Sequence, residues 1–343
     1  MARKQSDQAE GGINMLKSIA KRSALPVILL IVAVLFPIVV HNNYYIQICC
    51  TSMIYLVAVY GLNFITGMTG QTNLGTAGIF ALGAYTSALF ETVLGWNAWL
   101  SLIPVIAMGV IIGFGLGFPS LRLQGIYLAL TTIALTEIVR KVILAWSSLT
   151  QGALGIKQIP NISIFGLEIK TTTQYYYFAL VIIVILSIIC SRIIKGKWGR
   201  IMIAVKDNPE AASTCGANIV TIKLTAFVIA AILGCLAGWM FCHNYNYVNP
   251  STFTMDMSIN FVIMMSLGGA GNIYGCMLGA LAITLLPELL RVFGEYYQII
   301  YALIVVTFAV FLPGGITSLI KRGIDFLKVK CGKMRRQLNK AGG

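Results

Sequence analysis

Charged residues are scarce in this chain of 343 residues, which carries 11 Asp and Glu, 25 Lys and Arg, and two His. Only 10% of its residues are charged, whereas soluble domains contain about 25%, so an ordinary soluble domain is excluded. Hydrophobic residues make up 58% of the chain. Apolar runs of about 20 residues, long enough for a helix to cross a bilayer, recur along nearly the whole length. Because a β-barrel would show short alternating segments instead, an all-α, polytopic transmembrane helical bundle is predicted.

Catalytic motifs are also missing from the sequence. There is no GxSxG, no P-loop, no HExxH and no cluster of acidic residues with histidine. The eight cysteines show no CxxC or metal-type spacing, and most lie in apolar runs, where free buried thiols are expected. We therefore expect no enzymatic activity, no metal site and no cofactor bound by this chain. Energy from ATP would have to come from another subunit.

Few acidic residues fall inside the predicted spans. Glu137 and Glu288 are each followed three positions later by an arginine, so a partner on the same helix face can neutralise each carboxylate. No isolated Asp or Glu is predicted in the middle of a span, which counts against ion-coupled transport. His41 and His243 lie near predicted outer boundaries of the membrane and are interpreted as interfacial residues.

The net charge of +14 is unevenly distributed. If the N-terminus is cytoplasmic, most Lys and Arg fall on that side, in the N-terminal tail, between residues 192 and 223, and from residue 321 onward. This distribution follows the positive-inside rule, which places both termini in the cytoplasm and requires an even number of spans. A nucleic-acid partner is the weaker interpretation of the charge, and attraction of the C-terminal tail to lipid headgroups is favoured.

Ten spans satisfy hydropathy and charge together. They cover about residues 26–40, 45–65, 72–93, 98–118, 125–146, 175–194, 222–243, 258–270, 274–293 and 297–312. Two extracytoplasmic connections, residues 147–174 and 244–257, are rich in polar and turn-forming residues. Both connections could contact an external partner, and both could equally be inert.

The predicted organisation has three parts. Residues 1–25 form a basic cytoplasmic tail, residues 26–320 form the transmembrane domain, and residues 321–343 form a second basic cytoplasmic tail. The transmembrane domain includes a long cytoplasmic loop over residues 195–221.

Glycines recur at four-residue spacing in two of the predicted spans. Gly109, Gly113 and Gly117 follow one another in this way, and Gly234 and Gly238 repeat the step. Faces of small residues let helix backbones approach closely in lipid. We interpret these glycines as packing positions of the bundle.

Two Gly-rich stretches, residues 61–85 and 258–280, suggest helices that break within the membrane. The residues concerned are Asn63, Gln71, Thr72, Asn73 and Gly75 in the first stretch and Asn260, Gly268, Gly269 and Asn272 in the second. Broken helices with polar side chains are tolerated at membrane depth only where protein or water covers them, which favours a transport pathway. A plain turn between two spans is the alternative.

The long loop contains a pattern typical of a short capped helix, which reads E-A-A-x-x-x-G. Its residues are Asn208, Pro209, Glu210, Ala211, Ala212 and Gly216. Asp207 or Asn208 can be the N-cap, proline suits the first helical position, and the glutamate suits the positive end of the dipole. Gly216 can end the helix in a left-handed turn. The alanines would present a low-relief surface, so the helix is predicted to be a docking element for another protein.

Taken together, these segments resemble the permease subunits of ATP-binding-cassette importers for branched-chain amino acids. The resemblance covers most of residues 45–320, and the segments that carry it are residues 61–90, 121–140, 198–227, 266–291 and 311–316. Residues 71–77 read QTNLGTA, with Asn73 and Thr76 where the family usually has a serine and a histidine. Residues 150–156 also differ from the usual Gly-Gly-Ser-rich loop. These departures affect the substrate prediction more than the transporter class.

The resemblance implies a multi-pass pore subunit of the bacterial inner membrane with several partners. These would be a second permease in a heterodimer, two cytosolic ATPases that bind ATP and Mg, and an extracytoplasmic solute-binding protein. The capped helix would be the coupling helix, which sits in a cleft of the ATPase and transmits its closure to the spans.

The resemblance also implies inward transport of Leu, Ile or Val, with amides, urea or another small solute as near alternatives. From other classes, a secondary transporter or channel that needs no ATPase would require an ion site, for which Glu137 and Glu288 are poorly placed. A membrane scaffold without a transport role is the third alternative.

Overall fold

The computed structural model describes residues 33–123, 125–164, 166–311 and 315. The chain divides into two units, Met1–Gln47 and Ile48–Gly343. The described part of the first unit consists of a helical segment over residues 33–39 and the beginning of α2. Most of the predicted first span, residues 26–40, and both predicted tails, residues 1–25 and 321–343, therefore lie outside the described residues.

Long apolar helices dominate the described residues, which confirms the helical bundle. They are α2 (Asn43–Leu62), α3 (Thr76–Thr92), α4 (Ala98–Arg122), α5 (Ile126–Ala145), α7 (Thr172–Lys195), α10 (Ile219–Tyr245), α11 (Met255–Gly268), α12 (Ile273–Leu290) and α13 (Tyr297–Phe311). Each coincides with one of the nine predicted spans after the first, to within a few residues.

Five segments of the described chain are long and apolar enough to cross a membrane. They are Asn43–Met68, Ala98–Arg122, Thr172–Lys195, Ile219–Tyr245 and Ile273–Phe308. The last contains both α12 and α13, which are joined by η4 (Arg291–Tyr296), with a kink at Gly294. The apolar window of Asn43–Met68 is 78% buried and that of Thr172–Lys195 only 22%. The end of α2 that belongs to the second unit therefore lies in its interior, whereas α7 presents an apolar surface that suits lipid.

The two predicted extracytoplasmic connections fold against each other. The first contains α6 (Ser147–Thr150), η2 (Gly152–Leu154), β1 (Ile156–Lys157), β2 (Ser163–Ile164) and β3 (Leu167–Glu168), and the second contains β4 (Tyr247–Val248) and η3 (Pro250–Thr252). β1 pairs antiparallel with β4, with Ile156 opposite Val248, and β2 pairs with β3. Strands of two residues are thus the exception to the all-α prediction. The β1–β4 pair satisfies backbone groups between the two connections, and the β2–β3 pair does so within the first.

Glycine faces bring α10 close to α3 and α4, which confirms their interpretation as packing positions. A Cβ atom on Gly113 of α4 would lie 2.6 Å from the Val228 Cα atom of α10, and one on Gly109 would lie 2.8 Å from the Ile232 Cα atom. On the other side of α10, Gly238 lies against the backbone of Phe80 in α3. Backbone contacts this close leave no room for a side chain.

Gly113→Ala is expected to destabilise the bundle, whereas Gly115→Ala on the same helix is not. Overpacking of this kind costs about 1–3 kcal/mol, because α4 and α10 must separate to accept the methyl group. A Cβ atom on Gly115 meets nothing within 4 Å, and alanine favours the helix over glycine. Thermal unfolding of the purified protein in detergent measures both variants. Equal losses of stability would contradict the close approach of α4 and α10.

Candidate functional site

The helix that begins with α2 continues to the end of the apolar segment Asn43–Met68. Its last turn, η1 (Asn63–Met68), is a π-helix, and residues 70–75 have no regular structure before α3 begins. The Thr69 hydroxyl group donates to the Ile65 carbonyl oxygen at 2.7 Å, and the Gln71 N–H group donates to the same oxygen at 3.3 Å. The segment after the break thus caps part of the helix end, where carbonyl groups lack helical partners.

The second predicted break lies between α11 and α12. Gly269 and Gly271 adopt φ angles of 105° and 84°, which glycine tolerates and other residues rarely do. Asn272 caps α12, because its side chain accepts a hydrogen bond from the Tyr274 N–H group at 3.1 Å. The two helices pack so tightly that Gly268 lies against the backbone of Gly275.

The two breaks contact each other, and we call residues 63–75 together with residues 268–272 the helix-break site. The Asn63 side-chain oxygen accepts a hydrogen bond from the Gly271 N–H group at 2.7 Å, and Asn63 is only 1% exposed. A Cβ atom on Gly67 would lie 2.9 Å from the same Gly271 nitrogen. The Asn63 Nδ2 atom has no hydrogen-bond partner in the described part of the chain. An unpaired buried donor is costly and calls for an explanation, such as a bound polar group.

The predicted polar residues of the first break hold the loop in place. Gln71 and Asn73 are buried, and the Asn73 side chain accepts a hydrogen bond from the Gly75 N–H group at 2.8 Å. Thr72 is exposed, and its hydroxyl group donates to the Gly125 carbonyl oxygen at 2.7 Å, just before α5. Gly75 lies so close to α5 that a Cβ atom there would be 2.7 Å from the Thr132 carbonyl oxygen. The helix-break site is thus fixed against α5.

Asn260 does not lie at the second break, contrary to the sequence prediction. It sits inside α11, eight residues before Gly268, or about 12 Å away along the helix axis. The Tyr301 hydroxyl group of α13 donates to its side-chain oxygen at 3.1 Å. Asn260 therefore joins α11 to α13, because the helix continues for two turns beyond it before the glycines end it.

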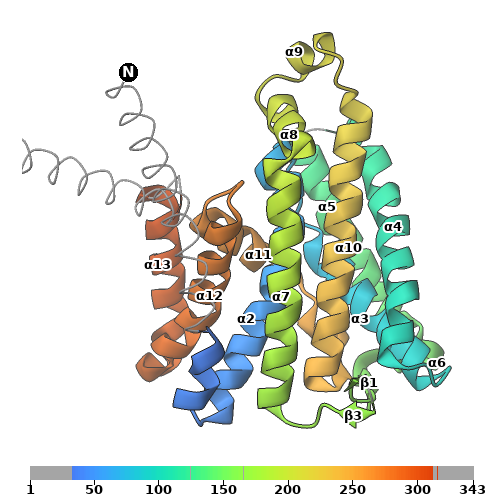
Figure 1. Cartoon of the computed structure of the whole chain (residues 1–343), viewed down its shortest axis with the longest axis vertical. Helices are drawn as coiled ribbons and strands as arrows, with labels where there is room; N and C mark the ends of the chain where they lie inside the picture. Colours follow the sequence, from blue (N-terminus) through green and yellow to red (C-terminus); the bar gives the residue numbers. More distant parts are fainter. Residues whose placement is uncertain (1–32, 124, 165, 312–314, 316–343) are drawn as a thin grey trace, which may run out of the picture. The chain divides into compact units, whose positions relative to one another are not determined.

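The capped helix in the long loop is present as predicted and follows a second helix. It is α9 (Pro209–Thr214), preceded by the amphipathic helix α8 (Lys197–Asp207), and Figure 1 shows it at the opposite end of α10 from β1. Asn208, rather than Asp207, is the N-cap, and its side chain accepts from the Ala211 N–H group at 3.0 Å. Gly216 has a φ angle of 86° and ends the helix in the predicted left-handed turn.

The prediction that the two alanines of α9 form one docking surface is wrong. Ala212 is 6% exposed and turned into the protein, so the two alanines do not form a common surface. Glu210 and Ala211 remain exposed. A helix of six residues is too short for its sequence pattern to show which of its sides faces the neighbouring helices.

Lys206, in the last turn of α8, connects the long loop to the helix-break site. Its Nζ atom donates a hydrogen bond to the Gly67 carbonyl oxygen at 2.9 Å. Gly70 lies beside its aliphatic stem, because a Cβ atom there would be 3.0 Å from the Lys206 Cγ atom. Apart from a positive charge in a basic loop, no sequence signal predicts this contact.

His243 is buried, so the prediction that it is an interfacial residue is wrong. It is 3% exposed, and its Nε2 atom lies 2.9 Å from the Oε2 atom of Glu91, which is 2% exposed. The hydroxyl groups of Ser87 and Ser101 donate to the other carboxylate oxygen at 2.7 and 2.6 Å. Hydropathy places these residues at the ends of spans, where water is expected. Instead the last turns of α3 and α10 pack against the first turn of α4, which excludes water.

The two predicted ion pairs within single helices are confirmed. Arg140 lies 2.7 Å from Glu137 in α5, and Arg291 lies 3.6 Å from Glu288. Both carboxylates are thus neutralised locally, as the three-residue spacing predicts.

Several helices long and apolar enough to cross a membrane, joined by short loops and by one long loop with a capped helix, are typical of polytopic membrane proteins. More particularly, the chain belongs to the family described as "Branched-chain amino acid transport system / permease component", which matches residues 44–311. It is a multi-pass permease of the inner membrane.

Named relatives agree with this family. The chain is 31% identical to the high-affinity branched-chain amino acid transport system permease protein LivM of Salmonella typhimurium, over 93% of this chain and 79% of the relative. It is 32% identical to LivM of Escherichia coli, over 92% of this chain and 79% of the relative. The fructose import permease protein FrcC of Rhizobium meliloti is 24% identical, with 82% of each chain covered. No solved structure matches the chain.

Proposed function

We propose that this chain is a permease subunit that carries branched-chain amino acids inward across the plasma membrane, driven by partner ATPases. The observation that carries the proposal is the family match over residues 44–311, together with identities of 31% and 32% to LivM proteins over more than nine-tenths of the chain. The fructose permease is more distant, at 24% identity, so a sugar substrate is less favoured. Amides and urea are near alternatives that the relatives named above do not support.

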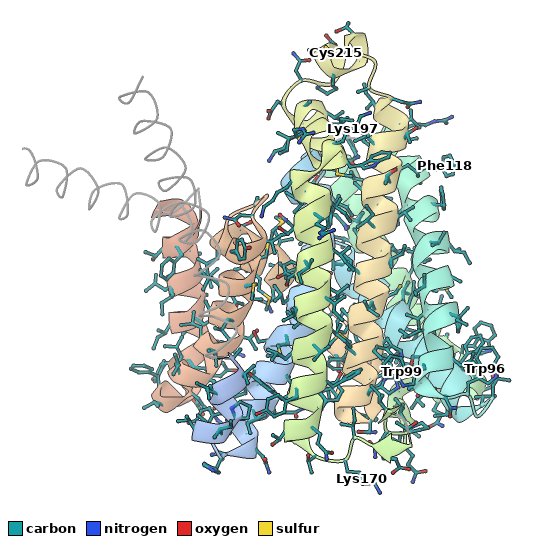
Figure 2. The ribbon with its side chains drawn as sticks, in the orientation of Figure 1. Trp96, Trp99, Phe118, Lys170, Lys197 and Cys215 are labelled. Carbon is teal, nitrogen blue, oxygen red and sulfur yellow. The ribbon has the colours of Figure 1, made fainter. Side chains whose placement is uncertain are left out.

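The proposed topology has ten spans and both termini in the cytoplasm. The distribution of charge supports it, because Arg122, Arg192 and Lys223 lie at helix ends near α8 and α9. Figure 2 places Lys197 and Cys215 at one end of the helices and Lys170 at the other. By the positive-inside rule, the end that bears α9 faces the cytoplasm. Residues 1–25 and 321–343 are then cytoplasmic tails flanking a permease domain over residues 26–320, with its coupling loop at residues 195–221.

The proposed partners follow from this topology. α9 with its caps, residues 208–216, is the coupling helix, and it docks into one of two cytosolic ATPases that bind ATP and Mg. A second permease completes a heterodimeric pore, and an extracytoplasmic solute-binding protein delivers the substrate to the connections at the other end. The chain itself binds no cofactor in this scheme.

The helix-break site is the proposed part of the transport pathway. Its support is the buried meeting of two interrupted helices, at the Asn63 side chain and the Gly271 N–H group, with the Asn63 Nδ2 donor unpaired in the described chain. Interrupted helices expose backbone groups that can bind polar parts of a substrate. Asn260, which lies outside the site, is no longer part of the proposed pathway.

Uptake of labelled leucine tests the proposed function. Proteoliposomes containing the complete transporter, with its binding protein, are expected to accumulate leucine only with ATP, and isoleucine and valine are expected to compete. Acetamide, urea and fructose are not expected to compete. Vesicles without the ATPase subunits are the control. Uptake that persists without them would refute the ATPase-driven mechanism, and competition by fructose alone would refute the substrate class.

A further inference from the structure

We propose that Lys206 is the positioning residue that connects movement of the coupling loop to the helix-break site. The inference rests on the proposed function. It names one hydrogen bond as the contact through which movement of the coupling loop reaches the helix-break site. Its starting point is the contact between the Lys206 Nζ atom and the Gly67 carbonyl oxygen, 2.9 Å apart. These residues are 139 positions apart in the chain, so the contact is a tertiary one between two separate elements.

The position of Lys206 on α8 suits this role. α8 ends at Asp207 and α9 begins at Pro209, so only Asp207 and Asn208 separate the lysine from the coupling helix. On the inner face of α8, Met202 and Val205 are 0% and 1% exposed. Because α8 is a packed helix joined to α9 by so short a connection, displacement of α9 is expected to move α8 and its lysine together rather than being lost in a loose loop.

The acceptor also suits the role. Gly67 lies in the last turn of the helix formed by α2 and η1, where carbonyl groups lack helical partners and carry the negative end of the helix dipole. An ammonium group there both completes a hydrogen bond and balances the partial charge. Withdrawing it would leave the carbonyl unsatisfied and favour a different arrangement of the π-helical turn.

The effect of such a change would reach both interrupted helices. Gly67 lies directly against the Asn63 side chain and the Gly271 nitrogen, with no room for a Cβ atom. The Asn63 side chain is bonded in turn to Gly271 between α11 and α12. A shift of the Gly67 backbone therefore cannot occur without moving the contact that joins the two breaks. A physical path thus runs from α9 through Lys206 and Gly67 to Asn63 and Gly271.

The test compares Lys206→Met with Lys206→Arg and with Lys197→Met. Lys197 is a matched control, because it is an exposed lysine at the start of the same helix and its side chain makes no hydrogen bond or ion pair within the described residues. For each variant of the complete reconstituted transporter, the maximal rate and the KM of leucine uptake and the ATP hydrolysed per leucine are measured. Thermal stability is recorded in parallel.

Lys206→Met is expected to lower the maximal uptake rate about tenfold and to raise the ATP hydrolysed per leucine, with KM within about twofold of the unchanged protein. Lys206→Arg retains the charge and the donor and is expected to recover most of the rate. Lys197→Met is expected to behave like the unchanged protein. If Lys206→Met does not assemble, Lys206→Gln, which removes the charge and shortens the side chain, is compared with the same controls.

Two results would overturn the inference. One is an unchanged rate and an unchanged ratio of ATP to leucine in Lys206→Met. The other is a loss of uptake that only follows a loss of folded protein, with the ratio unchanged, since a merely structural cap would behave in that way. ATP-independent uptake by the unchanged protein would instead refute the proposed function, so the two failures are distinguishable.

Discussion

Glu210→Lys is expected to lower leucine uptake and substrate-stimulated ATP hydrolysis by an order of magnitude or more, while the protein remains folded and inserted. Glu210 occupies the second position of α9, is exposed, and forms no ion pair with any other described residue. Reversal of its charge therefore breaks no internal contact. The cost at the helix dipole is about 0.3–1 kcal/mol, whereas disruption of a buried charge pair across an interface costs about 2–5 kcal/mol. The larger effect should thus arise at the surface of the partner ATPase.

Asp256→Lys provides the matched control for this prediction. Asp256 is also exposed and also occupies the second position of a helix, α11, which follows β4 and η3 along the chain. Its reversal should reproduce the small dipole cost in a thermal unfolding experiment without affecting the ATPase contact. Normal stimulated ATP hydrolysis in Glu210→Lys would refute the assignment of α9 as the coupling helix. If Asp256→Lys lost as much substrate-stimulated ATP hydrolysis as Glu210→Lys, the helix dipole rather than the ATPase contact would explain the effect.

The features that the sequence could predict are those determined by residues close together in the chain. α9 is recognisable because its signals lie within nine residues: an Asn208 side chain that caps its first turn, a proline at the first position, and Gly216 with a positive φ angle. The long helices are recognisable because an apolar run of bilayer length has few alternatives to a helix in lipid. The breaks are recognisable from glycines and short polar residues. None of these inferences requires knowledge of which helix lies next to which.

Contacts between distant segments explain what the sequence could not predict. The hydrogen bond from Gly271 to Asn63 spans 208 residues, and nothing near either residue specifies the other. A π-helical turn differs from an α-helical one by a shift of hydrogen-bond partners that no residue type requires. Asn63 and Asn260 occur in similar sequences, LNFI and INFV respectively, yet only Asn63 lies at a break. Burial of Ala212 and of His243 likewise depends on neighbouring helices.

The buried Glu91 and His243 pair is the clearest case, because the position of His243 at the end of a predicted span suggested a residue at the membrane boundary. The His243 Nδ1 atom lies 2.7 Å from the Trp239 carbonyl oxygen, which only accepts hydrogen bonds, so Nδ1 carries a proton. The Nε2 atom then faces the Glu91 carboxyl group at 2.9 Å, and a proton must lie between them. Together with the two serine donors, the carboxyl group joins the ends of α3, α4 and α10 by a fully paired polar network.

Glu91→Ala is expected to destabilise the protein by about 3–5 kcal/mol, because removal of one member leaves the other members of a buried pair unsatisfied. Glu91→Gln retains an acceptor oxygen for the serines and should cost less. Glu288→Gln is the control, since the Arg291 side chain that Glu288 pairs with is 72% exposed and such pairs contribute about 0–1 kcal/mol. Thermal unfolding in detergent measures all three variants. A loss in Glu91→Ala no larger than that in Glu288→Gln would contradict the network.

The same variants also separate a structural role from ion coupling, which a buried acid in a transporter would otherwise suggest. If the pair only joins helices, the molecules of Glu91→Gln that remain folded should carry leucine at a rate that depends on ATP and not on an ion gradient. Uptake by this variant is therefore measured per folded transporter, with and without an ionophore. An ion-driven component in the unchanged protein that disappears in Glu91→Gln would assign the pair to transport. Its complete enclosure by α3, α4 and α10 favours the structural role, because a coupling site must open to water in each cycle.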